Sequence, residues 1–317
     1  MIVANKNKVV EMANNLSESD SGAGRSLWRD ARTRFIHNKA ATVSLFVLIS
    51  IVLFSFIGPY FAVWSNEQID WNAMGIAAKV GMPSIESGHF FGTDDLGRDI
   101  YSRVIQGTQI SLMVGVLGAT VAVVVGTLYG ATSGYLGGRV DQIMMRFADF
   151  VVALPFLLFM ILFKIAFGIG PGESGIFPML VALVILMWPA TARLVRGQIL
   201  QIREQGYIGA SRLLGAKTNY LILRHMLPNT LGVVLVTITF AIPGAIFIEA
   251  FLSFIGMGVA PPTPSWGSMS NEGIKNMLTS PHELILPAIL ISITVLAFNL
   301  LGDGLRDALD ARLRNQE

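Results

Sequence analysis

The sequence predicts an all-α membrane protein with six transmembrane helices and both termini in the cytoplasm. Composition is the first observation behind this class: of 317 residues, 53% are hydrophobic and 14% are Asp, Glu, Lys or Arg, against roughly 25% charged residues in an ordinary soluble domain. The second is a series of nearly uncharged stretches, each close to the roughly 20 residues that a helix needs to cross a bilayer. The third is the distribution of Lys and Arg, which sets the orientation.

The N-terminal part of the chain is predicted to contain a tail, one transmembrane helix and a long loop. Residues 1–39 are polar and form a cytoplasmic tail without the apolar core of a signal peptide. Within the tail, residues 25–39 predict a basic amphipathic helix on the cytoplasmic interface. The first transmembrane helix follows at 40–64, and an external loop at 65–108. The apolar side of the amphipathic helix carries Leu27, Trp28, Ala31 and Phe35.

The other transmembrane helices are predicted within a domain at 109–303, and a cytoplasmic tail follows at 304–317. Four of these five helices contain a proline, which removes one helix hydrogen bond, so bent helices around a cavity are expected. The five predicted spans are 109–133, 150–170, 174–192, 228–248 and 284–301, and the prolines are Pro155, Pro189, Pro243 and Pro287.

Small residues recur at every fourth position through the second span and its exit. In a membrane, such a stripe lets another helix backbone approach closely. The helix that packs there belongs either to the same chain or to a second subunit. The stripe consists of Gly118, Ala122, Gly126, Gly130, Gly134 and Gly138.

Positively charged residues gather on the side of the membrane that carries both termini. That side holds eighteen Lys and Arg residues and the other side four, with Lys164 inside a span. Because positively charged loops are retained in the cytoplasm, both termini and the loop at 193–227 are predicted to be cytoplasmic. The loops at 65–108 and about 256–283 then lie outside.

Two charged residues fall at membrane depth, where a charge is costly and suggests a function. Glu249 lies near the outer end of the fifth span. It is predicted to line a polar pathway or to hold the outer loop, and the alternative is a carboxylate that reaches the outer interface. Lys164 is predicted to extend toward the outer headgroups.

The sequence lacks the signatures of an enzyme active site. It contains no G-x-x-x-x-G-K-[ST] phosphate loop, no H-E-x-x-H zinc motif and no G-x-S-x-G nucleophile motif. Its four histidines have no metal-ligand spacing, and it has no cysteine. The chain is therefore predicted to be no enzyme and to hold no metal. The energy for uphill transport would come from a partner protein or an ion gradient. A net charge of +2 does not favour nucleic-acid binding.

The cytoplasmic loop at 193–227 is predicted to contain a short amphipathic helix that glycine breaks at Gly215. An apolar stripe on this segment suits docking into a groove of another protein. The alternative is a segment that lies on the membrane interface. The stripe consists of Tyr207, Ala210, Leu213 and Leu214, and Arg203, Arg212, Lys217 and Arg224 keep the segment polar.

This loop resembles the E-A-A-x-x-x-G-x(9)-I-x-L-P loop of importer-type ABC transporter permeases. Ala210-Ser211-x-x-x-Gly215 is followed by His225-Met226-Leu227-Pro228, and Gly209 stands where that family usually has glutamate. The resemblance implies a coupling helix that docks on an ATP-hydrolysing subunit. The positions that it assigns to this ATPase-coupling loop are Tyr207, Gly209, Ala210, Ser211, Arg212, Leu213, Leu214, Gly215, Leu227 and Pro228.

Two further blocks resemble the dipeptide, oligopeptide and nickel permease subfamily. The segment FGTDDLGRDIYSR from Phe91 matches its G-T-D-x-x-G-R-D block, and EAFLSFIGMGVAPPTPSWG from Glu249 matches its E-A-x-L-S-F-L-G-L-G-x-x-P-P-x-P-S-W-G block. The tails, GRSLWRDARTRFIHNKAA and GDGLRDALD, are most similar to C-type membrane subunits of oligopeptide permeases. The external motif comprises Gly92, Thr93, Asp94, Gly97, Arg98 and Asp99, and the pathway or outer-gate set comprises Glu249, Ser253, Pro261, Pro262 and Trp266.

These blocks also have local structural interpretations. Thr93 or Asp94 is predicted to cap the helix that leads into the second span. The prolines of 260–264 force extended backbone, which predicts a stiff outer loop over the pathway entrance. Trp266 is expected near the headgroups.

The resemblance implies a type I ABC importer permease in a bacterial inner membrane. The expected partners are a second permease subunit in a heterodimer, two cytoplasmic ATP-binding subunits, an external solute-binding protein, peptide and lipid, with ATP and Mg used by the ATPases only. The alternatives are dipeptide or nickel-chelate transport by the same family, or an ion-coupled secondary transporter that uses Glu249 and Lys164. Inverted repeats would identify the latter.

Overall fold

The structure is a computed structural model that describes residues 27–74, 81–167 and 174–309. These residues form a bundle of long helices, and they include no β-strand beyond two isolated bridges, Ile69 with Arg98 and Thr93 with Asp99. The predicted all-α class is therefore confirmed. Arg25 and the rest of 1–26, together with 310–317, lie outside the described residues and contain parts of the predicted tails.

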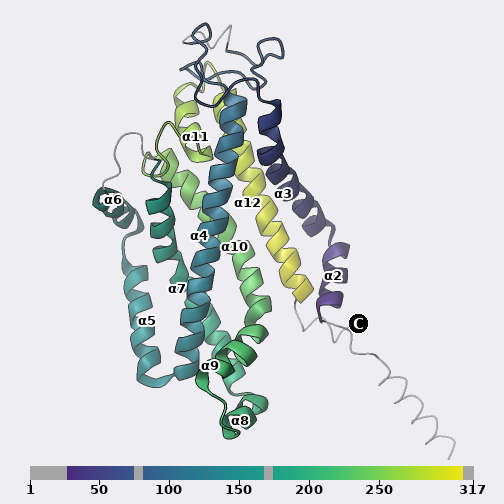
Figure 1. The fold of residues 1–317 in the computed structure, drawn as a ribbon, viewed down its shortest axis with the longest axis vertical. Coiled ribbons are helices and arrows are strands. Elements are labelled where there is room, and N and C mark those ends of the chain that lie inside the picture. The colour runs from purple at the N-terminus through teal and green to yellow at the C-terminus, as the bar shows by residue number, and fades with distance from the viewer. Residues whose placement is uncertain (1–26, 75–80, 168–173, 310–317) are drawn as a thin grey trace, which may run out of the picture.

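The helices follow one another along the chain with short connections, apart from the long segment between η1 and α4 (Figure 1). In chain order they are α2 (Leu27–His37), α3 (Lys39–Ile57), η1 (Gly58–Phe61), α4 (Ile100–Leu136), α5 (Gly138–Ala153), α6 (Phe156–Ala166), α7 (Ile176–Arg203), α8 (Gly206–Leu213), α9 (Thr218–Tyr220), η2 (Leu221–Met226), α10 (Leu227–Phe254), α11 (Trp266–Lys275) and α12 (His282–Leu309).

Five of the described helical segments are long and apolar enough to cross a membrane, and a sixth crossing is possible only as a bent pair. The five are Lys39–Phe61, Ile100–Leu136, Ile176–Arg203, Thr218–Phe254 and His282–Leu309. The span predicted at 150–170 begins in α5 and continues in α6, and the two helices meet at an angle of 87°, so any crossing there is strongly bent. Leu154 is extended before Pro155, since a residue that precedes proline is disfavoured in the helical conformation.

Two predicted loops are shorter than the sequence indicated. The external loop at 65–108 includes the start of α4, which begins at Ile100. The cytoplasmic loop at 193–227 includes the end of α7, which continues to Arg203. Pro189, Pro243 and Pro287 lie inside α7, α10 and α12 without ending them, as proline can in transmembrane helices.

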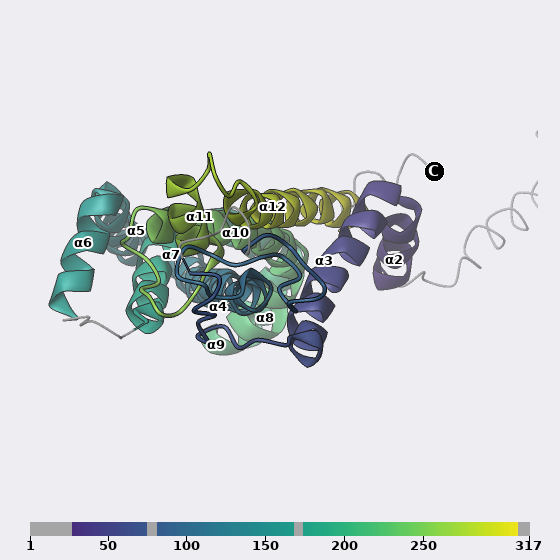
Figure 2. The ribbon, with the colours of Figure 1, turned by 90° about the horizontal axis from the view of Figure 1, so that it is seen from above.

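Helix α4 occupies the centre of the bundle, with α7, α5 and α6 on one side and α3 and α2 on the other (Figure 2). Its small residues contact α7 of the same chain. A Cβ atom added at Gly126 would lie 2.5 Å from the Trp188 carbonyl oxygen, and one at Gly130 would overlap the Ala192 carbonyl. The intrachain interpretation of the stripe is thereby confirmed, although nothing lies within 4 Å of the added atom at Gly138.

The bundle has two ends that differ in their connections. The α8 end holds α8, α9 and η2, and the α11 end holds α11 and the segment between η1 and α4 (Figure 1). Helix α2 packs on α12, and its residue Ala31 is buried. The predicted amphipathic helix is thus present as α2, whereas the side chains of Leu27 and Trp28 are not among those described.

Candidate functional site

The first candidate site is α8, which projects at one end of the bundle and contains most of the predicted coupling residues (Figure 1). The apolar side chain of Ile208 packs α8 against the bundle. Ile208 is fully buried and joins a core cluster with Val195 and Ile199 of α7 and with Met226 of η2. The short helix is therefore seated on the ends of α7 and α10 instead of hanging free.

Apolar side chains that point away from this cluster are not covered by any of the residues that the structure describes. Leu213 and Leu214 are 91% and 89% exposed, and Tyr207 is 44% exposed. Large apolar side chains with such exposure mark an interaction surface when they lie together. The structure thus separates the predicted stripe into a partly covered residue, Tyr207, and two outward leucines. Ala210 is also exposed.

Polar contacts tie the α8 region to the last turn of α4 and to the start of α10. The Arg203 guanidinium donates to the carbonyl oxygens of Gly134 at 3.2 Å and Tyr135 at 3.4 Å, and Arg212 lies 5.6 Å from the centre of the Tyr135 ring. The Asn229 amide donates to the Tyr207 hydroxyl at 3.2 Å. Arg212 and Tyr207 thus join α8 to α4 and α10, and Arg203 joins the end of α7 to α4.

A glycine turn ends α8. Gly215 has φ +84°, a conformation that L side chains rarely adopt, and the Ala216 amide donates to the Ser211 carbonyl at 3.1 Å. This is the Schellman arrangement, in which a left-handed glycine satisfies the last carbonyls of a helix. Gly209 leaves an open surface on α8, Leu227 and Pro228 begin α10, and Pro228 is exposed.

The second candidate site is at the α11 end, where the glycines of the external motif allow close backbone approach. Gly92 and Gly97 have φ +82° and +74°. A Cβ atom at Gly92 would overlap the Gly81 carbonyl, and one at Gly97 the Asp70 carbonyl. Thr93 is fully buried, and its amide donates to the Gly81 carbonyl at 2.8 Å.

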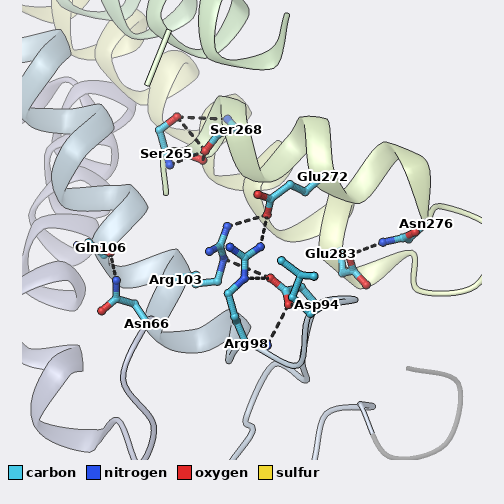
Figure 3. Close-up of polar contacts among 11 residues, drawn as sticks. Asn66, Asp94, Arg98, Arg103, Gln106, Ser265, Ser268, Glu272, Asn276 and Glu283 are labelled. Atoms are coloured by element: carbon cyan, nitrogen blue, oxygen red, sulfur yellow. Dashed lines mark hydrogen bonds and ion pairs between the residues drawn. The ribbon is translucent and has the colours of Figure 1, made fainter. Parts of the chain in front are cut away.

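An ion-pair network links this motif to α11 (Figure 3). The Asp94 carboxylate accepts a hydrogen bond from the Arg98 guanidinium at 2.7 Å. Arg98 and Arg103 both donate to one oxygen of Glu272, at 3.1 Å and 2.6 Å. The Arg103 side chain is 3% exposed. A buried guanidinium needs such partners, so the motif and α11 hold each other in place.

The prediction that Thr93 or Asp94 caps the next helix is wrong. The N-cap of α4 is Asp99, whose carboxylate accepts the Ser102 amide at 2.8 Å. Its other oxygen is 2.9 Å from His89 Nδ1. Asp94 instead accepts the amides of Leu96 and Arg98 within its own turn.

The predicted outer-gate residues divide into a buried cluster and an exposed turn. Glu249 is fully buried on α10 and accepts hydrogen bonds from Ser111 and Ser253, each at 2.8 Å. The Ser111 oxygen accepts the amide of Trp266 at 3.1 Å, and the Ser253 oxygen accepts the amide of Val259 at 3.0 Å. Through these two serines, Glu249 is linked to α4, to the middle of the 255–265 connection and to the start of α11.

Two expectations about this region need correction. Trp266 is fully buried and donates to the Thr108 hydroxyl at 3.1 Å, so it is not a headgroup residue. Glu249 does not reach an outer surface, which supports its role in holding the outer loop. Pro261 and Pro262, joined by a cis peptide bond, are exposed outside this cluster. Lys164 donates to the Gly256 carbonyl at 3.0 Å.

Several functional contacts were not predicted from the sequence. Ile208 was one of many apolar residues in its loop, and no spacing distinguished it. Glu272 stands alone among polar residues, and its pairing with Arg98 and Arg103 is a contact between distant segments. The negative charge of Glu272, opposite to the charge of the two arginines, was the only feature of the sequence that could have predicted this pairing.

The comparisons with known proteins agree with this arrangement. Residues 122–315 match the family model described as binding-protein-dependent transport system inner membrane component, and residues 26–78 match the N-terminal TM domain of oligopeptide transport permease C.

Similar proteins cover nearly the whole chain. The oligopeptide transport system permease protein OppC of Escherichia coli K12 is 45% identical over 99% of this chain and 100% of its own length. OppC of Haemophilus influenzae is 43% identical, over 92% of this chain and 90% of its own length. The dipeptide transport system permease protein DppC of Bacillus subtilis is 42% identical, over 94% of this chain and 90% of its own length. Among solved structures, a chain of the inward-facing methionine ABC transporter MetNI has a TM-score of 0.53 at 18% identity, covering 65% of this chain and 96% of that one.

Proposed function

The chain belongs to the family of binding-protein-dependent transport inner membrane components, and we propose that it is the membrane-spanning permease subunit of an ATP-driven oligopeptide importer. The observation that carries this proposal is the full-length similarity to OppC, 45% over 99% of the chain. The fold is that of type I ABC importer permeases, as the likeness to MetNI indicates. Members of this family are non-catalytic, and the chain itself binds no ATP.

The proposed importer contains four kinds of protein. A second permease subunit forms the pathway together with this chain, two ATP-binding subunits lie in the cytoplasm, and a peptide-binding protein delivers substrate outside. Both termini and α8 lie on the cytoplasmic side of a bacterial inner membrane in this proposal. The positively charged connections at the α8 end support that orientation.

The mechanism starts at α8. Leu213 and Leu214 enter an apolar groove of the ATPase, where burial of exposed leucine favours association. When ATP closes the ATPases, α8 moves with them. Ile208, Arg203 and Arg212 then pass the displacement to α7 and α4. The cavity opens outward to receive peptide, and hydrolysis restores the inward-facing conformer.

At the opposite end, the proposal gives the Glu249 cluster a holding role. Ser111 on α4 and Ser253 on α10 both donate to the Glu249 carboxylate, and the Ser111 oxygen accepts the Trp266 amide at the start of α11. Movement of α4 relative to α10 therefore changes the support of the outer loop. This links the pathway entrance to the helix that α8 contacts.

Glu249→Gln separates ATP-driven import from ion-coupled transport. Glutamine keeps the size and the hydrogen-bonding capacity of Glu249 and removes its ability to carry a proton. We expect peptide accumulation in ATP-loaded vesicles with all subunits to fall at most severalfold and to ignore a protonophore. Accumulation that follows a proton gradient and ignores ATP would overturn the proposal. Uptake of dipeptides in preference to longer peptides would assign the substrate class of DppC instead.

The orientation has its own test, because the chain contains no cysteine. Ser87→Cys and Lys217→Cys place single thiols at exposed positions on opposite ends. We expect an impermeant maleimide applied to intact cells to label the first variant and to label the second only after the membrane is opened. Labelling of Lys217→Cys in sealed cells would show that α8 faces outward.

A further inference from the structure

The α11 end contains a small charged pocket that the proposed mechanism does not use. Its volume is about 250 Å³, and it lies between the external motif and the connection from α11 to α12. The charged residues that line it are Asp94, Asp95, Arg98, Glu272, Lys275 and Glu283. Figure 3 shows Glu283 beside Asp94 and Arg98, with Asn276 on its other side.

Glu283 has an oxygen without a hydrogen-bond partner in this pocket. The residue is 4% exposed, and its Oε2 atom accepts the Asn276 amide at 3.1 Å. Its Oε1 atom is buried and, like the hydroxyl of the neighbouring Ser280, has no hydrogen bond of normal geometry among the described residues. An unsatisfied buried acceptor destabilises the folded protein, and more so when it is charged. A donor that enters the pocket would relieve this cost.

The pocket contains more carboxyl groups than basic side chains, which favours binding of a cation. Asp94 and Glu272 are paired with Arg98 and Arg103. Asp95 and Glu283 remain against the single charge of Lys275, which forms no ion pair with either of them in the described part of the chain. A cation that enters the pocket would be attracted to Asp95 and would favour the ionised form of Glu283.

The chemistry of the available oxygen favours an ammonium group. No group of three or more metal-ligating side chains converges within the described residues, so the arrangement does not suit a metal ion. Arginine prefers both oxygens of a carboxylate, and Asn276 already uses one of them. A lysine ammonium needs only a single acceptor and is compact.

The surroundings of the pocket resemble the rim of a protein interface. Leu96 lines it and is 46% exposed, Ile274 is 47% exposed, and Leu278 in the same connection is 94% exposed. Apolar side chains around a desolvated polar centre are typical of protein docking sites. A pocket of this size accepts a side chain and not a whole peptide.

We propose that this pocket receives a lysine side chain of the external peptide-binding protein when that protein docks. The ammonium bonds to Glu283 Oε1 and balances Asp95, while Leu96 and Leu278 contact the surrounding surface. The inference rests on the proposed function, because only an importer with the α11 end outside meets such a protein there.

Glu283→Gln tests the pocket in the assembled transporter. The probe is the fluorescently labelled peptide-binding protein of the same importer, titrated onto the four-subunit complex in nanodiscs. We expect Glu283→Gln to weaken binding about tenfold or more, because it removes the charge that a buried ammonium contacts. Asp95→Asn, at an exposed position, should weaken it severalfold and reduce its dependence on salt.

Glu86→Gln is the matched control, because Glu86 is an exposed carboxylate at the same end that does not line the pocket. It should bind like the parent. A carbodiimide, which joins contacting carboxylates and amines, should link Asp95 or Glu283 to a lysine of the binding protein.

The outcomes separate the inference from the proposed function. Parental binding by both pocket variants would overturn the inference alone. A cross-link from the pocket to the second permease or to the peptide would also overturn it, since the occupant would be different. Failure of the parent complex to bind any peptide-binding protein would count against the proposed function itself.

Discussion

Gly126→Ala is expected to destabilise the folded chain by about 2–3 kcal/mol, the upper part of the roughly 1–3 kcal/mol that overpacked cores cost. The added methyl group would lie 2.5 Å from the Trp188 carbonyl oxygen and 2.7 Å from Thr191 Cβ. Both atoms belong to α7, and the first is backbone, so the two helices must separate. Alanine stabilises an isolated helix by about 1 kcal/mol relative to glycine, which offsets only part of this cost. The measurement is the unfolding free energy in mixed detergent, together with the abundance in the membrane.

Gly118→Ala provides the control on the same stripe. There the nearest atom to the new methyl group is Leu180 Cδ2 at 3.6 Å, an ordinary contact. We expect this variant to be as stable as the parent or slightly more so. Equal stability of the Gly126 and Gly118 variants would show that α4 and α7 do not approach as closely as described.

Leu214→Asp is expected to abolish ATP-dependent uptake while the chain folds and inserts normally. The side chain is 89% exposed, so aspartate costs the isolated chain little. In the complex, it would place an unpaired charge in an apolar groove, and we expect the affinity for the ATPase subunit to fall at least about tenfold. Co-purification of the ATPase with the tagged chain and peptide uptake in proteoliposomes measure the two effects.

Ile85→Asp is the matched substitution at the opposite end, where Ile85 is 86% exposed. It introduces the same charge and should leave ATPase association intact. If the Leu214→Asp transporter retained its ATPase and its uptake, α8 would not be the docking element.

The long apolar helices could be predicted from the sequence because lipid demands a simple pattern. A run of uncharged residues long enough to cross the membrane has few other folded forms, and α3, α10 and α12 lie close to their predicted spans. The break between α5 and α6 could not be predicted in the same way. Four spans contain a proline, and among them only Pro155 separates two helices. Whether a proline bends a helix or ends it depends on the residues that pack beside it.

The polar contacts of the candidate sites were harder to predict, because they join distant segments. Thr93, Asp94 and Asp99 are all good helix caps, and the choice of Asp99 follows from where the α4 axis begins. Trp266 was predicted to lie near the headgroups, but in the structure its indole N–H donates to the buried hydroxyl of Thr108. The exposed leucines of α8 were predicted correctly as an apolar stripe, since they lie within one short segment.

The length of α4 has a consequence for how the two ends of the molecule communicate. Its 37 residues make a rod of roughly 55 Å at 1.5 Å per residue, well beyond the roughly 30 Å of the hydrocarbon layer. One end of the rod carries Arg103, bonded to Glu272, and the other offers the Gly134 carbonyl to Arg203. A ligand that favours one tilt of this rod at either end changes the binding free energy at the other, and thermodynamic linkage makes the two effects equal. In the proposed importer, the nucleotide state of the ATPases and the affinity for the external protein would then be reciprocal quantities, and each could be measured through the other.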